Sequence, residues 1–400
     1  MNMLNKINPT LDSPLMTELF ELERMRYELT SGTTPKWLFY DLKEVMHLLE
    51  SLASARIEGN RTTLVAAAND AVNNNQRTAN EGILEIRNVR NAINYIERVI
   101  TPGGAISLKN IEEIHRRVVF NLNRDGSNNP GIFRQKEVTI SGSSCVLPTF
   151  DNVPRLMGDL VDYINANNSK KEDIIKIADV HHEFTVIHPF DNGNGRTARA
   201  LTYAMLIKQG FLRNGKAILN PSSVFCIDRK AYYDGLSRAD AGTVEGLENW
   251  CLYVAKGISE ELNRVKKLLD KDYAMNNLIL PAIKLAQKQF LITDVEAEIL
   301  QIAAEKDIIQ AQDIAHLFGN TPSNNTKRSR FLSTMVNKGL LMRPPKSPKK
   351  YTMRFMNKYL LTSILDIMNT NGLLPVHDSE DGLRGKTTEQ SRNSIPSEPI

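Results

Sequence analysis

Residues 188–199 constrain this chain more than any other stretch, and they read His-Pro-Phe-Asp-Asn-Gly-Asn-Gly-Arg-Thr-Ala-Arg. His188 ends an apolar run, and Gly193 and Gly195 then alternate with asparagines. Glycine at alternate positions lets the backbone turn sharply and direct several N–H groups at one point. The residues that follow have helical character, so the turn should lead into a helix N-terminus, which is a ready site for an anion.

The charged side chains of this segment suggest chemistry on a phosphate. Arg196 and Arg199 lie one helical turn apart, so both can reach the same anion. A lone histidine is usually a satisfied core residue, but His188 beside a phosphate-type turn is better interpreted as a general base. No Gly-Lys-Ser/Thr follows the glycines, so the segment is not a P-loop. The combination predicts transfer of a nucleotide or phosphoryl group to a hydroxyl.

The segment resembles the signature of Fic-domain proteins (Fic/Doc superfamily adenylyltransferases), His-Pro-Phe-x-Asp/Glu-Gly-Asn-Gly-Arg-x-x-Arg. The resemblance implies that His188 deprotonates a Ser, Thr or Tyr hydroxyl of a target protein. That hydroxyl would attack the α-phosphate of ATP, and pyrophosphate would leave. The resemblance also implies that the nucleotide is bound by Asn192, Gly193, Asn194, Gly195, Arg196, Thr197 and Arg199.

Asn192 is where the sequence departs from that signature, since the family carries an acid at this position and uses it to hold Mg²⁺. An asparagine keeps an oxygen donor and loses the negative charge. Magnesium prefers hard anionic oxygens but often needs only one carboxylate beside phosphates and waters. We therefore expect ATP and Mg²⁺ as cofactors, with weaker metal binding at Asn192.

Residues 54–59 resemble the inhibitory motif of the same family, Ser/Thr-x-x-x-Glu-Gly/Asn. Ser54 and Glu58 are four residues apart and share one helix face. Taken alone, the pattern is equally that of a helix end with its glycine cap. With the signature downstream, we predict that Glu58 pairs with Arg199 and keeps that arginine from the γ-phosphate.

Two further segments resemble parts of the family's substrate site. Two short β-like runs within residues 137–148 predict a hairpin, similar to the flap that docks an extended target by strand addition. The residues expected near substrate and nucleotide are Thr139, Ile140, Ser141 and Gly142 in the hairpin, and Tyr232 and Tyr233 at the adenine pocket. An ordinary surface hairpin and a core tyrosine pair are the plainer alternatives.

The spacing of apolar residues predicts a mainly α fold: a Fic helical core with a β-hairpin flap, plus a small C-terminal winged-helix domain. Helices are expected at 14–29, 38–57, 81–100, 108–120, 153–165, 173–185, from the signature to about 278, and at 294–306, 310–318 and 323–338. The expected domains are an N-terminal helical region (1–100) carrying the inhibitory helix, the Fic catalytic core (101–278), the winged-helix-like region (290–356) and a disordered tail (372–400).

The winged-helix-like region suggests a second partner. Basic residues in its third helix and around its hairpin could neutralise DNA phosphates; they are Lys327, Arg328, Arg330, Arg343, Lys346, Lys349 and Lys350. A packing or protein-interaction module with a solvated basic face is the alternative. The formal net charge is only +4, so any nucleic-acid role needs such a local patch. A DNA-binding regulator with a weakened Fic core is the alternative function.

Three cysteines without C-x-x-C spacing favour a reducing cytoplasm over a disulfide framework or a zinc site. Residues 1–6 have no apolar signal region, and no run of about 18 apolar residues predicts a membrane span. The expected partners are ATP, a target protein with a hydroxyl side chain and DNA. A homodimer is compatible with the sequence, and no membrane partner is expected.

Overall fold

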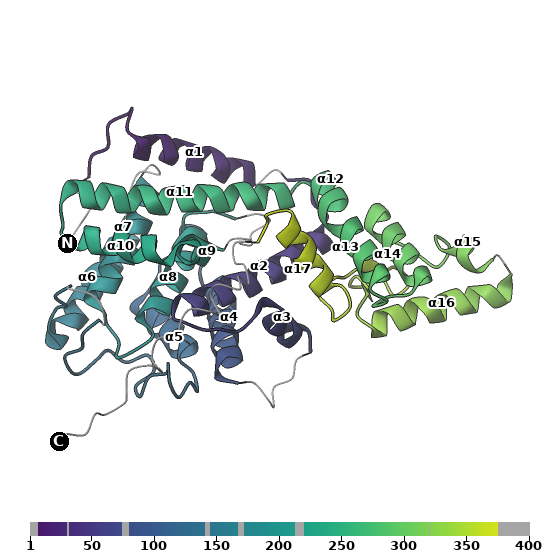
Figure 1. Ribbon diagram of the computed structural model, residues 1–400, viewed down its shortest axis with the longest axis horizontal. Coiled ribbons are helices and arrows are strands. Elements are labelled where there is room, and N and C mark those ends of the chain that lie inside the picture. Colours follow the sequence, from purple (N-terminus) through teal and green to yellow (C-terminus); the bar gives the residue numbers. More distant parts are fainter. Residues whose placement is uncertain are drawn as a thin grey trace, which may run out of the picture.

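The computed structural model describes residues 7–29, 32–73, 80–140, 145–166, 172–212, 220–319 and 321–374, which form a mainly helical protein (Figure 1). The helices up to the end of the signature region are α1 (Pro14–Glu28), α2 (Lys36–Ile57), α3 (Leu64–Asn73), α4 (Glu81–Val99), α5 (Leu108–Val118), α6 (Val153–Asn165), α7 (Asp173–Ile187) and α8 (Asn194–Lys208). The remaining helices are α9 (Pro221–Ile227), α10 (Arg229–Asp240), α11 (Val244–Leu268), α12 (Lys271–Ala274), α13 (Leu280–Lys288), α14 (Asp294–Lys306), α15 (Ala315–Phe318), α16 (Pro322–Asn337) and α17 (Leu361–Thr370).

Helix α8 is the centre of the bundle. It contacts α2, α4, α5, α7 and α9, and every residue from Arg196 to Ile207 is buried. A helix that is buried all round needs small or apolar side chains on most faces, and its sequence supplies them in Ala198, Ala200, Leu201 and Ala204. The signature segment therefore lies at the N-terminal end of this buried central helix.

The signature turn between α7 and α8 depends on two left-handed residues. His188 ends α7 with φ 48°, and Gly193 begins α8 with φ 75°. A Cβ atom at position 193 would lie 2.5 Å from Val119 Cγ1, so only glycine fits there. This turn holds the histidine at one helix end and the free N–H groups of α8 at the other.

The expected helices agree with α1, α2, α4–α8, α14 and α16 within a few residues. The expected helix over 310–318 is wrong, because only α15 forms there. Asp313 Oδ2 accepts a hydrogen bond from Gln310 N at 2.7 Å, which makes a turn. Ile309 pairs with Tyr351 in an isolated bridge. The helices α3, α13 and α17 were not predicted, and α17 packs against α3 and α13.

The C-terminal region carries a small sheet after α16. Strands β1 (Leu341–Met342) and β2 (Thr352–Met353) pair antiparallel, with Leu341 opposite Met353. They form the hairpin that was expected near the end of the winged-helix-like region. Figure 1 shows α15 and α16 at the far end of the molecule from α6. The expected tail lies outside the described residues from 375 onward.

The hairpin expected over 137–148 forms no strand in its described residues, 137–140 and 145–148. At the ends of this segment, the Arg134 guanidinium donates to the carbonyls of Lys136 and Pro148. Residues 141–144, including Ser141 and Gly142, lie outside the described residues. No helix in the described ranges is long and apolar enough to cross a membrane.

Candidate active site

A cavity of about 570 Å³ lies at the N-terminal end of α8. Its volume is in the range of small-molecule sites in proteins. It brings together the candidate base, the inhibitory glutamate and the tyrosine pair. Its lining includes Glu58, Ile140, His188, Asn194, Gly195, Arg199, Tyr232 and Tyr233.

His188 is held in one tautomer. Its Nδ1 lies 3.3 Å from Thr185 O, and because a carbonyl can only accept, Nδ1 carries the proton and Nε2 has a free lone pair. Arg134 Nε donates to His188 O at 2.9 Å and fixes the backbone. Burial lowers the pKa of His188 below its ordinary value of 6.5, and the Arg134 charge lowers it further. The imidazole is therefore neutral at pH 7 and can accept a proton at Nε2.

Arg199 is bound to the end of α2. Its Nε donates to Ser54 Oγ at 3.0 Å, and its NH2 donates to Ser54 O at 3.0 Å and to Glu58 Oε1 at 2.7 Å. The arginine side chain is 1% exposed and that of Glu58 is 30% exposed. Burial would raise the pKa of Glu58, but the Arg199 charge outweighs it and the pKa lies below 4.5. The predicted contact between Glu58 and Arg199 is therefore present and ionic.

The carboxylate of Glu58 also lies on the first turn of α8. A Cβ atom at Gly195 would come within 2.3 Å of Glu58 Oε1 and 3.1 Å of Arg199 NH1. Only glycine permits this approach. The free N–H groups and the dipole at a helix N-terminus attract negative charge. A resident carboxylate thus occupies the anion position that the sequence assigns to a phosphate.

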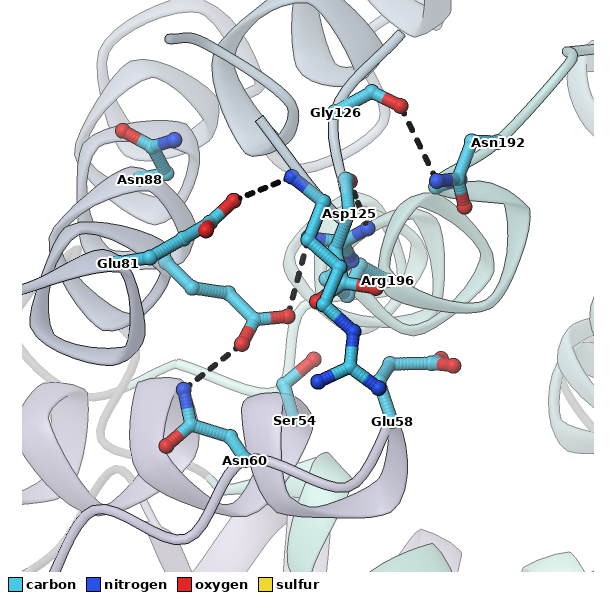
Figure 2. A network of polar contacts seen from close by, with 12 residues as sticks. Ser54, Glu58, Asn60, Glu81, Asn88, Asp125, Gly126, Asn192 and Arg196 are labelled. Carbon is cyan, nitrogen blue, oxygen red and sulfur yellow. Dashed lines mark hydrogen bonds and ion pairs between the residues drawn. The ribbon is translucent and has the colours of Figure 1, made fainter. Parts of the chain in front are cut away.

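The other signature side chains have partners of their own. Asn194 bonds both N and O of Phe190 at 2.9 Å and closes the loop, and Thr197 Oγ1 donates to Gly193 O. Arg196 NH1 lies 3.0 Å from Glu85 Oε1, and its NH2 donates to Asp125 O (Figure 2). Of the two arginines expected at one anion, only Arg199 lines the cavity.

Asn192 is turned to a different neighbour. Its Nδ2 donates to Gly126 O at 3.0 Å and its Oδ1 accepts from Gly193 N at 2.7 Å (Figure 2). It lines a second cavity together with Thr139, while Asp191 accepts from Ser127 Oγ. No group of three or more His, Cys, Asp or Glu in the described residues could hold a metal. Asn192 itself offers no charged oxygen to Mg²⁺, and both of its amide atoms are already bonded within the protein.

Residues 105–206 match the sequence model of the Fic/DOC family, and this segment includes the whole signature. This segment is therefore similar to the domains of that family. A relative from Nematostella vectensis named Protein adenylyltransferase Fic is 28% identical over 249 residues, which are 58% of this chain and 52% of its own. One from Caenorhabditis briggsae, named Protein adenylyltransferase fic-1, is 30% identical over 161 residues, 40% of this chain and 28% of its own. The chain spans about half the length, or less, of these curated relatives.

Solved structures share the fold. A Fic family protein from Desulfovibrio desulfuricans G20 aligns with a TM-score of 0.54 at 19% identity, over 87% of this chain and 98% of that one. A Fic domain containing signaling protein from Bacteroides thetaiotaomicron VPI-5482 aligns with a TM-score of 0.52 at 17% identity, over 63% of this chain and 96% of that one. The mainly helical Fic fold is therefore common to all three.

The two tyrosines that line the cavity have unlike surroundings. Tyr232 is buried, and its hydroxyl lies 3.0 Å from His181 Nε2. Tyr233 is 43% exposed, with its ring centroid 5.0 Å from that of Tyr232. Asp240 lines the same cavity, and its Oδ1 lies 2.8 Å from His182 Nε2. The inner tyrosine is a fixed part of the wall, and the outer one presents a ring face to the cavity.

His115 on α5 is a residue that the sequence analysis missed. Its ring stacks on Phe190 at 3.7 Å, its Nε2 donates to Asn192 O at 3.0 Å, and its Nδ1 accepts from Gly131 N at 2.8 Å. The bond from Gly131 requires an unprotonated Nδ1 and therefore the neutral ring, and burial lowers the pKa of His115 to about 4. Nothing in the local sequence marks this residue, because the signature lies more than 70 positions away.

The pKa of His115 predicts a pH-dependent stability. Its folded pKa of about 4 lies below the ordinary 6.5, so its contribution is full above pH 6.5 and is lost as pH falls toward 4. A His115→Phe variant keeps the stack and loses both hydrogen bonds, which costs about 1–3 kcal/mol of unfolding free energy. Thermal unfolding at about pH 5 and about pH 7.5 should show a smaller pH difference for the variant than for the parent. The control is His316→Phe, whose side chain is 57% exposed; equal pH differences in all three proteins would contradict the assignment.

Proposed function

We propose that this chain is a protein adenylyltransferase that transfers AMP from ATP to a Ser, Thr or Tyr hydroxyl of a target protein, and that Glu58 restrains it. The observation that carries the proposal is the place of the Glu58 carboxylate. It lies on the first turn of α8 and on Arg199, in the same cavity as the free Nε2 of His188. The names of the relatives, Protein adenylyltransferase Fic and fic-1, support the same reaction.

In the proposed reaction, His188 Nε2 takes the proton of the attacking hydroxyl. The hydroxyl oxygen forms a bond to the α-phosphorus of ATP, and the bond between that phosphorus and the leaving oxygen breaks, which releases pyrophosphate. The N–H groups of α8 and the Arg199 guanidinium stabilise the anionic phosphates. The tyrosine pair offers a wall for the base. Because Asn192 does not fit a protein-held magnesium ion, no step is assigned to the metal.

The restraint is a competition between two anions. Arg199 cannot bind a γ-phosphate while Glu58 holds its NH2 at 2.7 Å. The carboxylate also lies against Gly195, on the first turn of α8. ATP must therefore displace Glu58 before its α-phosphate can align with the base.

Removal of the carboxylate should release the enzyme. Glu58→Gly should raise incorporation of label from α-labelled ATP roughly tenfold or more, because one charge-assisted competitor is gone. The assay uses the full chain with a cell lysate as target source, and counts label in the target and in the chain itself. Glu58→Gly combined with His188→Ala should return to background. Equal incorporation in parent and Glu58→Gly would contradict the restraint, and label that survives His188→Ala would contradict the role of the base.

The pH profile should follow His188. Its pKa is lowered from 6.5, mainly by burial, so the active neutral form is lost only as pH falls through that lowered value. In Glu58→Gly the pKa falls further, because the Glu58 charge raises it in the parent. Initial rates of AMP transfer by Glu58→Gly from about pH 5 to about pH 8 should reach a plateau below pH 6.5. A midpoint at or above pH 6.5 would contradict this.

We propose, as a second function, that the C-terminal region binds DNA, because one of its segments carries only basic charges. Residues 314–365 contain ten Lys or Arg and no Asp or Glu, although the whole chain carries a net charge of only +4. Lys327 and Arg330 on α16 are exposed, as are Arg343, Lys346, Lys349 and Lys350 between the strands. Arg328, also expected on this surface, is 5% exposed and donates to Gly319 O. A surface of one sign that lacks acids suits a polyanion.

A gel shift with random-sequence duplex tests this second function. Lys327→Ala/Arg330→Ala should weaken binding and lower the slope of log K against log salt by about two. The control removes two exposed charges elsewhere, Lys109→Ala/Arg155→Ala, and should keep the parent slope. An equal change in both pairs, or no shift of the parent at low salt, would contradict a DNA surface on α16.

A further inference from the structure

A second carboxylate lies behind Glu58, on the far side from the nucleotide cavity. Glu85 on α4 is 4% exposed and lines a polar cleft of about 750 Å³. The cleft is also lined by Glu58, Asn60 and Asp125. Figure 2 shows Glu58, Asn60 and Asp125 close together between the end of α2, the start of α4 and the start of α8. None of the roles assigned above uses this carboxylate.

Glu85 joins two elements of the proposed restraint. Its Oε2 accepts from Asn60 Nδ2 at 2.7 Å, and its Oε1 lies 3.0 Å from Arg196 NH1. Asn60 also donates to Gly82 O at 2.9 Å and accepts from Thr62 N at 2.8 Å. The side-chain amide of Asn60 thus attaches the segment that follows Glu58 to α4. One of its bonds ends on Glu85, whose carboxylate also contacts Arg196.

The contact between Glu85 and Arg196 is ionic but poorly aligned. Arg196 Nε, Arg196 NH1 and Glu85 Oε1 are buried without a hydrogen-bond partner. The Arg196 side chain is 2% exposed. A buried charge held by one counter-charge with its donors unused is costly, and an incoming anion that satisfies those donors would be favoured. Arg196 is therefore held by the Glu85 carboxylate and by the Asp125 carbonyl, and its Nε and NH1 donors remain unused.

Arg196 is also close enough to affect the Glu58 site. Burial raises and Arg199 lowers the pKa of Glu58, and the Arg196 charge adds to the lowering. The two arginines are three residues apart on α8, so a phosphate chain on the first turn of that helix lies within reach of both. Only one of them lines the cavity at present.

We propose that Glu85 is a positioning residue, a second latch that holds Arg196 off the nucleotide cavity for as long as Asn60 keeps the end of α2 in place. The proposal rests on the proposed function and extends its regulation. Glu58 restrains Arg199, and Glu85 restrains Arg196. Departure of residues 58–62 removes the Glu58 bond from Arg199 and the Asn60 bond from Glu85 together. Arg199 then loses its counter-charge, and Glu85 is no longer fixed by Asn60 in its place on Arg196.

The first experiment tests the latch without nucleotide. Backbone amide exchange of residues 56–64 is measured by mass spectrometry in the full chain. Asn60→Ala and Glu85→Gln should each speed exchange about fivefold, because each removes a charge-assisted bond of the segment. The matched control is Glu81→Gln, on the same helix and the same cleft, where the carboxylate instead accepts from Arg124 N. Exchange in both variants equal to that of Glu81→Gln overturns the latch; where thermal unfolding shows that Glu85→Gln does not fold, Asn60→Ala decides.

The second experiment separates release of Arg196 from a general loss of structure. In the Glu58→Gly background, adding Glu85→Gln should tighten binding of a non-hydrolysable ATP analogue about tenfold and leave adenosine binding unchanged. A merely structural role would weaken both ligands together, and that result, or no change in either, overturns the proposal. If Glu58→Gly transfers no AMP, the proposed function fails, while the exchange measurement still decides on the latch.

Discussion

The interaction on which the site depends is the carboxylate of Glu58 against the first turn of α8. Arg199 is 1% exposed and needs an anion at all times, because a buried guanidinium without one is strongly unfavourable. Ser54 accepts two of its hydrogen bonds and Glu58 supplies the charge. The same contact therefore stabilises the fold and, in the proposed function, occupies the place of a phosphate of the nucleotide.

Helix α2 gives this contact its rigidity. It runs for 22 residues without glycine or proline, and most of its residues are buried. Near its start, Asp41 accepts from Phe355 N at 2.6 Å and Met356 N at 3.3 Å, and burial raises the pKa of Asp41 to about 6. The residues that follow β2 are thus attached to the same helix whose other end carries Ser54 and Glu58. A shift of α2 along its axis would change both contacts together.

The sequence predicted what depends on local spacing. The turn at 188–199 and most helices follow from residue types a few positions apart. The pairing of Glu58 with Arg199, 141 positions apart, was predicted from the resemblance of two separate motifs to one family. The sequence did not predict the partners of Arg196, because Glu85 and Asp125 come from segments distant in the chain. For the same reason His115 was missed, although it holds the signature turn. The described residues of the expected flap form no strand, and the contacts of Arg134 with Lys136 O and Pro148 O at its two ends were not predicted either.

Two buried arginines and two carboxylates define the resting state of the domain. A site that binds phosphates must keep its guanidinium groups buried away from water. Buried guanidinium groups need an anion from the protein itself when the nucleotide is absent. Glu58 and Glu85 meet that need from two different helices, and Asn60 connects them. Loss of either carboxylate thus removes a competitor of the nucleotide and also a counter-charge of the fold. A bound nucleotide can replace the lost counter-charge, because it binds only to the folded state and stabilises that state. Loss of a carboxylate therefore lowers the stability of this domain and at the same time favours its activation.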